Sequence, residues 1–284
     1  MLILLQPIAA GVGMYVFTRT LRLSRLAAVL SSISFMFCGF ITVWMAYGTL
    51  GYAALTLPWI LWSLTRLIGS TDRKWILVTS VFVAFSLFSG HIQTSAYVVG
   101  SAILFIIAWR RNLKKALFAL SLGFVIAASQ LIPTIRFYDQ SVRSELFQKI
   151  EVIPWNYLPT LLAPDILGNP VTRNDWFGHY AEWASFAGVI PLVLALFAVF
   201  APIKKRRMIW MFTILGGISL LLAFQTPILD FVVSLKIPVL STSAASRVIV
   251  LLSFSIAVLS GFGFDLITIA WERYHRYVLF YSAW

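Results

Sequence analysis

Four short polar segments interrupt an otherwise apolar sequence, and each holds side chains that could do chemistry. The segment 89–94 contains His91 and Gln93, an imidazole and an amide that are costly to place in lipid without partners or a function. His91 could equally cap a helix or hydrogen-bond within a turn. The segment 241–247 ends in Arg247, whose planar guanidinium suits a phosphate group. Snorkelling of this arginine to the membrane interface is the alternative interpretation.

Two further segments contribute acidic side chains. The segment 164–170 includes Asp165 and Asn169 between two prolines. Asp165 could coordinate a divalent cation or act as a base, but an aspartate after a proline also commonly forms a turn, and we favour the turn. Glu182 lies at the expected start of a helix, where the helix dipole stabilises an acid. His179 could join it at a metal, although two ligands do not specify a metal site.

The elements that position these segments must lie in a membrane. Hydrophobic residues make up 60% of the 284 residues, charged residues make up 11%, and the mean hydropathy is +0.90. Such a chain is too apolar to enclose its surface in water. Because a helix crosses the hydrocarbon layer with roughly 20 residues, we predict an all-α, polytopic transmembrane helical bundle that forms one domain over residues 1–284. The nine spans are predicted near 2–18, 26–46, 50–67, 75–89, 92–109, 116–135, 183–201, 208–224 and 247–270.

The basic residues predict the orientation of this bundle. The net charge of +12 is spread between apolar runs rather than gathered on a solvated face, which excludes a nucleic-acid binder. Sixteen of the 22 basic residues follow odd-numbered spans and therefore lie on one side, while seven of the ten acids lie on the other. Cytoplasmic loops are enriched in Lys and Arg. We therefore predict a cytoplasmic C-terminus, with the N-terminus and a long loop over 136–182 outside the cytoplasm.

Absent motifs narrow the function further. The sequence has no phosphate-binding loop, no His-Glu-x-x-His zinc motif and no Gly-x-Ser-x-Gly nucleophile elbow. Asp265 is the one acid within a predicted span, which argues against an ion-coupled transporter.

Six short motifs follow one another along the chain. They are Gly-Val-Gly-Met-Tyr at 11–15, Ser-Gly-His-Ile-Gln-Thr at 89–94, Gln-Leu-Ile-Pro-Thr at 130–134, Pro-Asp-Ile-Leu-Gly-Asn-Pro at 164–170, Glu182 with Gly188 and Pro191, and Ser246-Arg247 leading to Gly-Phe-Gly at 261–263. In this order they resemble the YfhO family of bacterial membrane proteins, and the resemblance extends through nearly the whole chain.

The resemblance implies a glycosyltransferase of the GT-C superfamily in the bacterial cytoplasmic membrane. Such an enzyme takes a sugar from a polyprenyl-phosphate carrier and transfers it to an acceptor outside the cytoplasm, in this family a cell-envelope polymer such as a teichoic acid. Arg247, together with Arg136 or Arg143, is then expected to hold the donor phosphate. Asp165 or Glu182 is expected to bind a divalent cation or to activate the acceptor hydroxyl. The residues expected to contact substrate are His91, Gln93, Arg136, Arg143, Asn169 and Arg247.

One departure from the family pattern leaves other functions open. Enzymes of this superfamily typically have a catalytic acid between the first two spans, whereas no acid precedes Asp72 here, and family members continue beyond the last span. The resemblance thus suggests a fragment that lacks both ends, and it leaves open whether the chain is active alone. A transporter or flippase of a lipid-linked saccharide, or a non-catalytic membrane scaffold, is the alternative.

Overall fold

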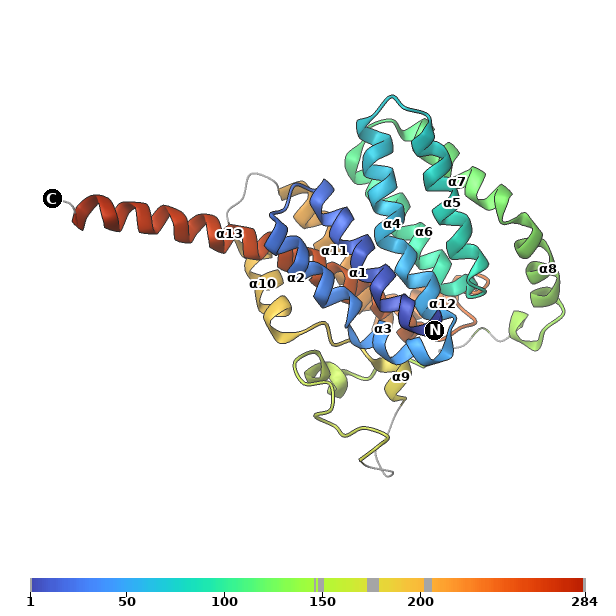
Figure 1. The fold of residues 1–284 in the computed structure, drawn as a ribbon. Coiled ribbons are helices and arrows are strands. Elements are labelled where there is room, and N and C mark those ends of the chain that lie inside the picture. Colours follow the sequence, from blue (N-terminus) through green and yellow to red (C-terminus); the bar gives the residue numbers. More distant parts are fainter. Residues whose placement is uncertain (1, 146, 148–150, 173–178, 202–205, 283–284) are drawn as a thin grey trace.

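The structure, a computed structural model, is all-helical over the residues that it describes, which are 2–145, 147, 151–172, 179–201 and 206–282 (Figure 1). Within these residues the extended backbone is limited to an isolated bridge between Ile153 and Phe224. The α-helices are α1 (Leu2–Thr20), α2 (Arg25–Met36), α3 (Gly39–Trp44), α4 (Leu50–Gly69), α5 (Lys74–Phe88), α6 (Ile92–Trp109), α7 (Leu113–Ile126), α8 (Ala128–Asp139), α9 (Tyr180–Trp183), α10 (Val189–Phe200), α11 (Arg206–Ala223), α12 (Pro227–Ser234) and α13 (Val250–Ser282). Four 3₁₀ helices complete the set: η1 (Met45–Tyr47), η2 (Val142–Ser144), η3 (Trp155–Leu161) and η4 (Ala245–Ile249).

Among the described residues, two helical stretches are long and apolar enough to cross a membrane, namely α6 and the stretch Ala245–Trp271. Two bent pairs meet the same criterion if each is taken as one span: α2 with α3 and η1, bent by 46°, and α7 with α8, bent by 70°. Shorter apolar helices lie at Lys74–Phe88, Val189–Phe200 and Arg207–Ala223. The fold is therefore that of a membrane-associated helical protein with two to four candidate spans.

The helix breaks predicted within the longest apolar runs are present. Gly48 and Gly90 both have a positive φ, of 71° and 81°, which glycine adopts without steric cost. Gly48 separates η1 from α4, and Gly90 separates α5 from α6. The second break places the polar segment 89–94 at a turn, where its groups can find partners.

Aromatic side chains fill the centre of the bundle. Phe254 of α13 is fully buried, and its ring lies 5.2 Å from that of Phe35 in α2 and 6.1 Å from those of Phe17 in α1 and Phe212 in α11. Phe105 of α6 packs edge-on against Phe17 at 6.0 Å. The aromatic cluster therefore joins five helices that are distant in the sequence.

Within the predicted span 183–201, Trp183 ends α9 and the chain becomes helical again only at Val189, because 184–188 is unwound. Three donors from neighbouring helices satisfy this stretch, as irregular backbone within a membrane protein requires. The backbone N–H of Gly39 donates to the carbonyl of Phe186 at 2.7 Å, and the hydroxyls of Ser34 and Ser253 donate to Ala187 and Ser185 at 2.8 and 3.2 Å. The same contact with Phe186 explains why the predicted span 26–46 is divided between α2 and α3.

The predicted span 116–135 is also divided, by the 70° bend between α7 and α8. Helix α8 has no buried residue and lies at the edge of the molecule (Figure 1). It contains Gln130, Arg136 and Asp139, which a straight continuation of α7 would carry across the hydrocarbon layer at a cost. The long loop predicted from residue 136 therefore begins after Asp139.

Close packing between α10 and α13 depends on Gly263. A Cβ atom at this position would overlap the backbone carbonyl of Leu194, which cannot move without displacing α10. We expect Gly263→Ala to destabilise the fold by about 2 kcal/mol, because overpacking of this kind forces backbone shifts. Gly217→Ala is the matched control, since a Cβ there meets nothing within 4 Å. Thermal unfolding in detergent tests this, and equal midpoints for the two variants would contradict it.

Candidate functional site

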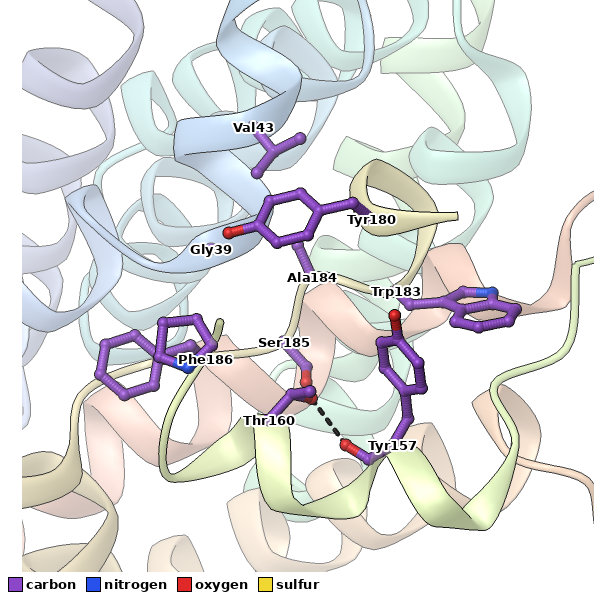
Figure 2. Close-up of a pocket in the computed structure, with 10 residues that line it drawn as sticks. Gly39, Val43, Tyr157, Thr160, Tyr180, Trp183, Ala184, Ser185 and Phe186 are labelled. Carbon is purple, nitrogen blue, oxygen red and sulfur yellow. Dashed lines mark hydrogen bonds between the residues drawn. The ribbon is translucent and has the colours of Figure 1, made fainter. Parts of the chain in front are cut away.

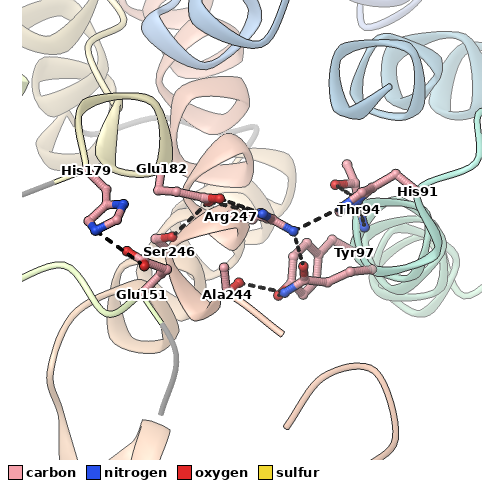
Figure 3. A network of polar contacts seen from close by, with 10 residues as sticks. His91, Thr94, Tyr97, Glu151, His179, Glu182, Ala244, Ser246 and Arg247 are labelled. Carbon is pink, nitrogen blue, oxygen red and sulfur yellow. Dashed lines mark hydrogen bonds and ion pairs between the residues drawn. The ribbon is translucent and has the colours of Figure 1, made fainter. Parts of the chain in front are cut away.

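A buried ion pair joins the last polar segment to the start of the seventh predicted span. Arg247 lies in η4 and Glu182 in α9, and their side chains are 17% and 12% exposed. The guanidinium is bidentate: Nε lies 2.9 Å from Oε2 of Glu182, and Nη2 lies 2.5 Å from Oε1 (Figure 3). Arg247 is thus held inside the protein, in contrast to the snorkelling alternative.

The remaining face of the guanidinium meets the turn before α6. Nη1 of Arg247 lies 3.1 Å from Nε2 of His91 and 3.4 Å from Oε1 of Gln93 (Figure 3). Four of the predicted site residues, which are far apart in the sequence, therefore come together. We call His91, Gln93, Glu182 and Arg247 the polar cluster.

Each ring nitrogen of His91 faces a hydrogen-bond donor. Its Nδ1 caps α6, lying 3.2 Å from the backbone N–H of Thr94, while its Nε2 faces Arg247. A backbone N–H and a guanidinium can only donate, so each needs an unprotonated ring nitrogen. A neutral imidazole has only one such nitrogen. The cluster in this form therefore has one donor more than His91 can satisfy.

Two further residues, which were not predicted from the sequence, belong to the site. Trp44 places its ring 5.4 Å from the guanidinium carbon of Arg247, within the range of a cation–π contact. Tyr97 places its hydroxyl 2.8 Å from the amide nitrogen of Gln93. The spacing of four residues between Gln93 and Tyr97 on one helix could have indicated their contact. No local signal distinguishes Trp44 from the other aromatic residues of the apolar runs.

Gln93 also ties the polar cluster to the backbone before η4. Its amide nitrogen donates to the carbonyl of Ala244 at 2.6 Å. On the other side of η4, the backbone N–H of Ser246 donates to the carbonyl of Glu151 at 3.0 Å, and the carboxylate of Glu151 lies 3.6 Å from Nε2 of His179. These contacts fix η4, and with it Arg247, between α6 and the segment around Glu151.

Asp165 lies at the edge of a separate, aromatic pocket. Its backbone carbonyl accepts from Gly168 at 2.9 Å, which confirms the predicted turn, and its exposed carboxylate accepts from the Tyr180 hydroxyl at 2.7 Å. Burial and the neighbouring carboxylate raise the pKa of Tyr180 to about 12, so that its hydroxyl remains a donor at neutral pH. Helix α9 carries both Tyr180 and Glu182 and thereby links the pocket to the polar cluster.

Rings of Tyr157, Tyr180 and Trp183 surround this aromatic pocket (Figure 2). The Tyr157 and Trp183 rings meet edge-on with their centroids 4.6 Å apart. The pocket floor comes from the unwound stretch, including Ala184 and Ser185. The pocket thus places aromatic rings next to the carboxylate of Asp165, which accepts from Tyr180.

The other predicted site residues lie outside the polar cluster. The side-chain oxygen of Asn169 accepts from the backbone N–H groups of Val171 and Thr172, both at 3.0 Å, and so holds a local turn. Arg136 is exposed near the end of α8. Arg143 lies in η2, and its side chain is outside the described part.

For the predicted divalent cation, the described residues offer no group of three His, Cys, Asp or Glu side chains that could hold a metal ion. Asp165 and Glu182 are each bonded to a different partner, Tyr180 and Arg247. Within the described part of the chain, side chains of these four types therefore do not form a metal site by themselves.

An apolar groove adjoins the polar cluster. It runs between α6, α11 and α12, and Tyr97 and Ala245, which flank the cluster, line one part of it. The groove is partly open to its surroundings, and its cavity volume is about 310 Å³. Its other lining residues are Ala96, Gly100, Ser101, Leu104, Leu215, Ile218, Leu222, Leu229, Val232, Leu240, Val248 and Leu251.

Fold and site together define a helical, membrane-associated protein in which the polar cluster around Arg247 adjoins an apolar groove. Comparison of the chain with known protein families, with curated proteins and with solved structures finds no match.

Proposed function

We propose that this chain belongs to a bacterial cytoplasmic-membrane glycosyltransferase, similar to the GT-C superfamily and the YfhO family, that uses a polyprenyl-phosphate-linked sugar. The proposal includes the nine-span topology, with 136–182 outside the cytoplasm and the C-terminus inside. The observation that carries it is the position of the polar cluster, with Arg247 at its centre, at one end of the apolar groove. A polyprenyl phosphate has two matching parts: an anionic phosphate that suits the polar cluster, and a long hydrocarbon chain that suits the groove.

A phosphate would resolve the conflict at His91. An anionic oxygen between His91 and Arg247 can accept from both, so that His91 carries its proton on Nε2 and keeps Nδ1 free to cap α6. Glu182 meanwhile neutralises one edge of the guanidinium and keeps it oriented. The cluster is thus better suited to binding an anion than to remaining empty.

The groove would then hold the hydrocarbon part of the donor. Its lining is almost entirely aliphatic, and it starts beside Tyr97, which Gln93 connects to Arg247. A polyprenyl chain that lies in the groove would leave its phosphate within reach of Arg247. This arrangement also supports a lipid-linked donor over a soluble nucleotide sugar.

The sugar would lie beside Tyr180 at the mouth of the aromatic pocket, whose own volume of about 30 Å³ holds little more than a water molecule, and Asp165 would be the base. The acceptor hydroxyl oxygen would bond to the anomeric carbon, the bond from that carbon to the phosphate oxygen would break, and the hydroxyl proton would pass to Asp165. Polyprenyl phosphate is the leaving group. Glu182 is the weaker candidate for the base, because both of its oxygens already accept from Arg247.

A transfer assay in reconstituted membranes tests the proposal. Labelled sugar on polyprenyl phosphate is supplied with cell-envelope polymer, and both donor binding and transfer are measured for the chain alone and with any segment that its gene encodes upstream. Arg247→Lys keeps the charge but loses the bidentate contact, and we expect it to weaken donor binding at least tenfold. Asp165→Asn should leave binding intact and reduce transfer by 10²-fold or more.

Lys236→Asn provides the control, since Lys236 is an exposed cation outside the cluster and asparagine tolerates its positive φ of 50°. Unchanged donor binding by Arg247→Lys would refute the phosphate site. Donor binding without transfer, in both forms of the chain, would favour the flippase or scaffold alternative.

A further inference from the structure

We propose a second lipid site, for an anionic phospholipid, at the opposite ends of the helices from the polar cluster. A cavity there is lined by Thr20, Leu21, Arg22, Trp109, Arg207, Met208 and Phe262, and we call it the basic cavity. It lies where α1 and α6 end and α11 begins, it is partly open, and its cavity volume is about 360 Å³. The inference rests on the membrane orientation proposed above but not on the glycosyltransferase activity.

The basic cavity offers two cations without a described counter-charge. Arg22 and Arg207 are both exposed, and within the described residues neither forms an ion pair with a carboxylate. Arg19 is nearby but donates to the carbonyl of Leu23, and the carboxylate of Asp265 accepts from the backbone of Ser24. Both guanidinium groups that line the cavity therefore keep donors for an anion.

Trp109 contributes its indole ring to the wall of the basic cavity. Its N–H has no hydrogen-bond partner among the described residues, but this atom is buried and is not open to the cavity.

Arg22 lies two residues after the end of α1 and has a φ of 65°, in the left-handed region where glycine is usual after a helix. Its positive charge also interacts favourably with the end of α1.

The lining favours a lipid over a free phosphate ion. Leu21, Met208 and Phe262 give the basic cavity a mainly apolar wall beside the two arginines. Basic pockets between helices on the cytoplasmic side of membrane proteins suit anionic headgroups, and this end is the one where the sequence gathers its Lys and Arg. We therefore assign the cavity to a phosphatidylglycerol-like lipid, with its phosphate on the arginines and its glycerol and upper acyl chains on the apolar wall.

Native mass spectrometry of the full chain in detergent, titrated with phosphatidylglycerol and with phosphatidylcholine, tests the site. We expect the first phosphatidylglycerol to bind more tightly than phosphatidylcholine. The double variant Arg22→Asn with Arg207→Gln should weaken it about 25-fold, since each arginine near an anionic headgroup contributes roughly fivefold. Asparagine is chosen because it tolerates the left-handed backbone of Arg22.

The matched control is Arg25→Gln with Arg73→Gln, which removes two exposed cations that do not line the cavity. Equal losses in the two double variants would reduce the effect to net charge and overturn the site, as would equal binding of the two lipids by the wild type. Competition with glycerol 3-phosphate separates the sources of the anion, because displacement at the same concentration as the lipid would overturn the lipid assignment. Arg207→Gln alone, expected to lose about fivefold, tests the site if the double variant does not fold.

Discussion

Replacing Glu182 with alanine is expected to lower the free energy of unfolding by about 3 kcal/mol, because it leaves the guanidinium of Arg247 buried without its counter-charge. The effect should be large because both side chains are more than four-fifths buried and share a bidentate contact. The measurement is the thermal or denaturant-induced unfolding of each variant in one detergent. Binding of donor plays no part in it, so the result is independent of any activity.

A double-mutant cycle separates the ion pair from simple loss of packing. The variant Glu182→Ala with Arg247→Ala removes both charges, and we expect it to be more stable than the sum of the two single losses predicts, since no unpaired charge is left buried. Lys74→Ala is the control, because it breaks an exposed ion pair of 2.9 Å with Asp72 and leaves the carboxylate of Asp72 at the start of α5. It should leave the unfolding midpoint nearly unchanged. Additive losses in the cycle would show that Glu182 and Arg247 are not coupled.

Replacing Phe254 with alanine is expected to destabilise the fold by about 3 kcal/mol, because it empties the centre of the aromatic cluster. The reason differs from that in a soluble core. In a membrane the side chain is surrounded by apolar groups whether or not the helices are packed, so the loss comes chiefly from missing contacts and the cavity left behind. Phe254 touches the rings of Phe17, Phe35 and Phe212, which lie on three other helices.

Two comparisons make this prediction specific. Phe254→Leu should retain most of the stability, because it leaves a smaller cavity. Phe200→Ala removes a phenyl ring that is 80% exposed and should have little effect. If Phe200→Ala and Phe254→Ala are equally destabilising, then the aromatic cluster does not hold the helices together.

Local chemistry accounts for the parts of the fold that the sequence predicted. The breaks at Gly48 and Gly90 are visible in the sequence because glycine takes a positive φ at little cost. The turn at Asp165 and the capping of α6 by His91 likewise involve residues within a few positions of one another. Interactions of this range leave a signature in the residue types themselves.

Longer-range features could not be predicted in the same way. The unwound stretch 184–188 reads as part of an apolar helix, but it ends at Gly188, whose φ is 100°, and donors of Gly39, Ser34 and Ser253 satisfy its carbonyls. The bend between α7 and α8 likewise changes a predicted span into a helix at the edge of the bundle. In each case packing against distant elements outweighed a weak local preference.

The candidate site shows the same division. Residue types alone identified His91, Gln93, Glu182 and Arg247 as polar groups that an apolar chain would keep only for a reason. Their assembly was not predictable, because Glu182 and Arg247 are 65 residues apart and Arg247 and His91 are 156 apart. Folding alone brings Trp44 over the guanidinium and leaves Asn169 and Arg136 outside the cluster. The unfavourable free energy of burying a polar group can be judged from its residue type. The partner that offsets this free energy is set by the three-dimensional packing of the helices.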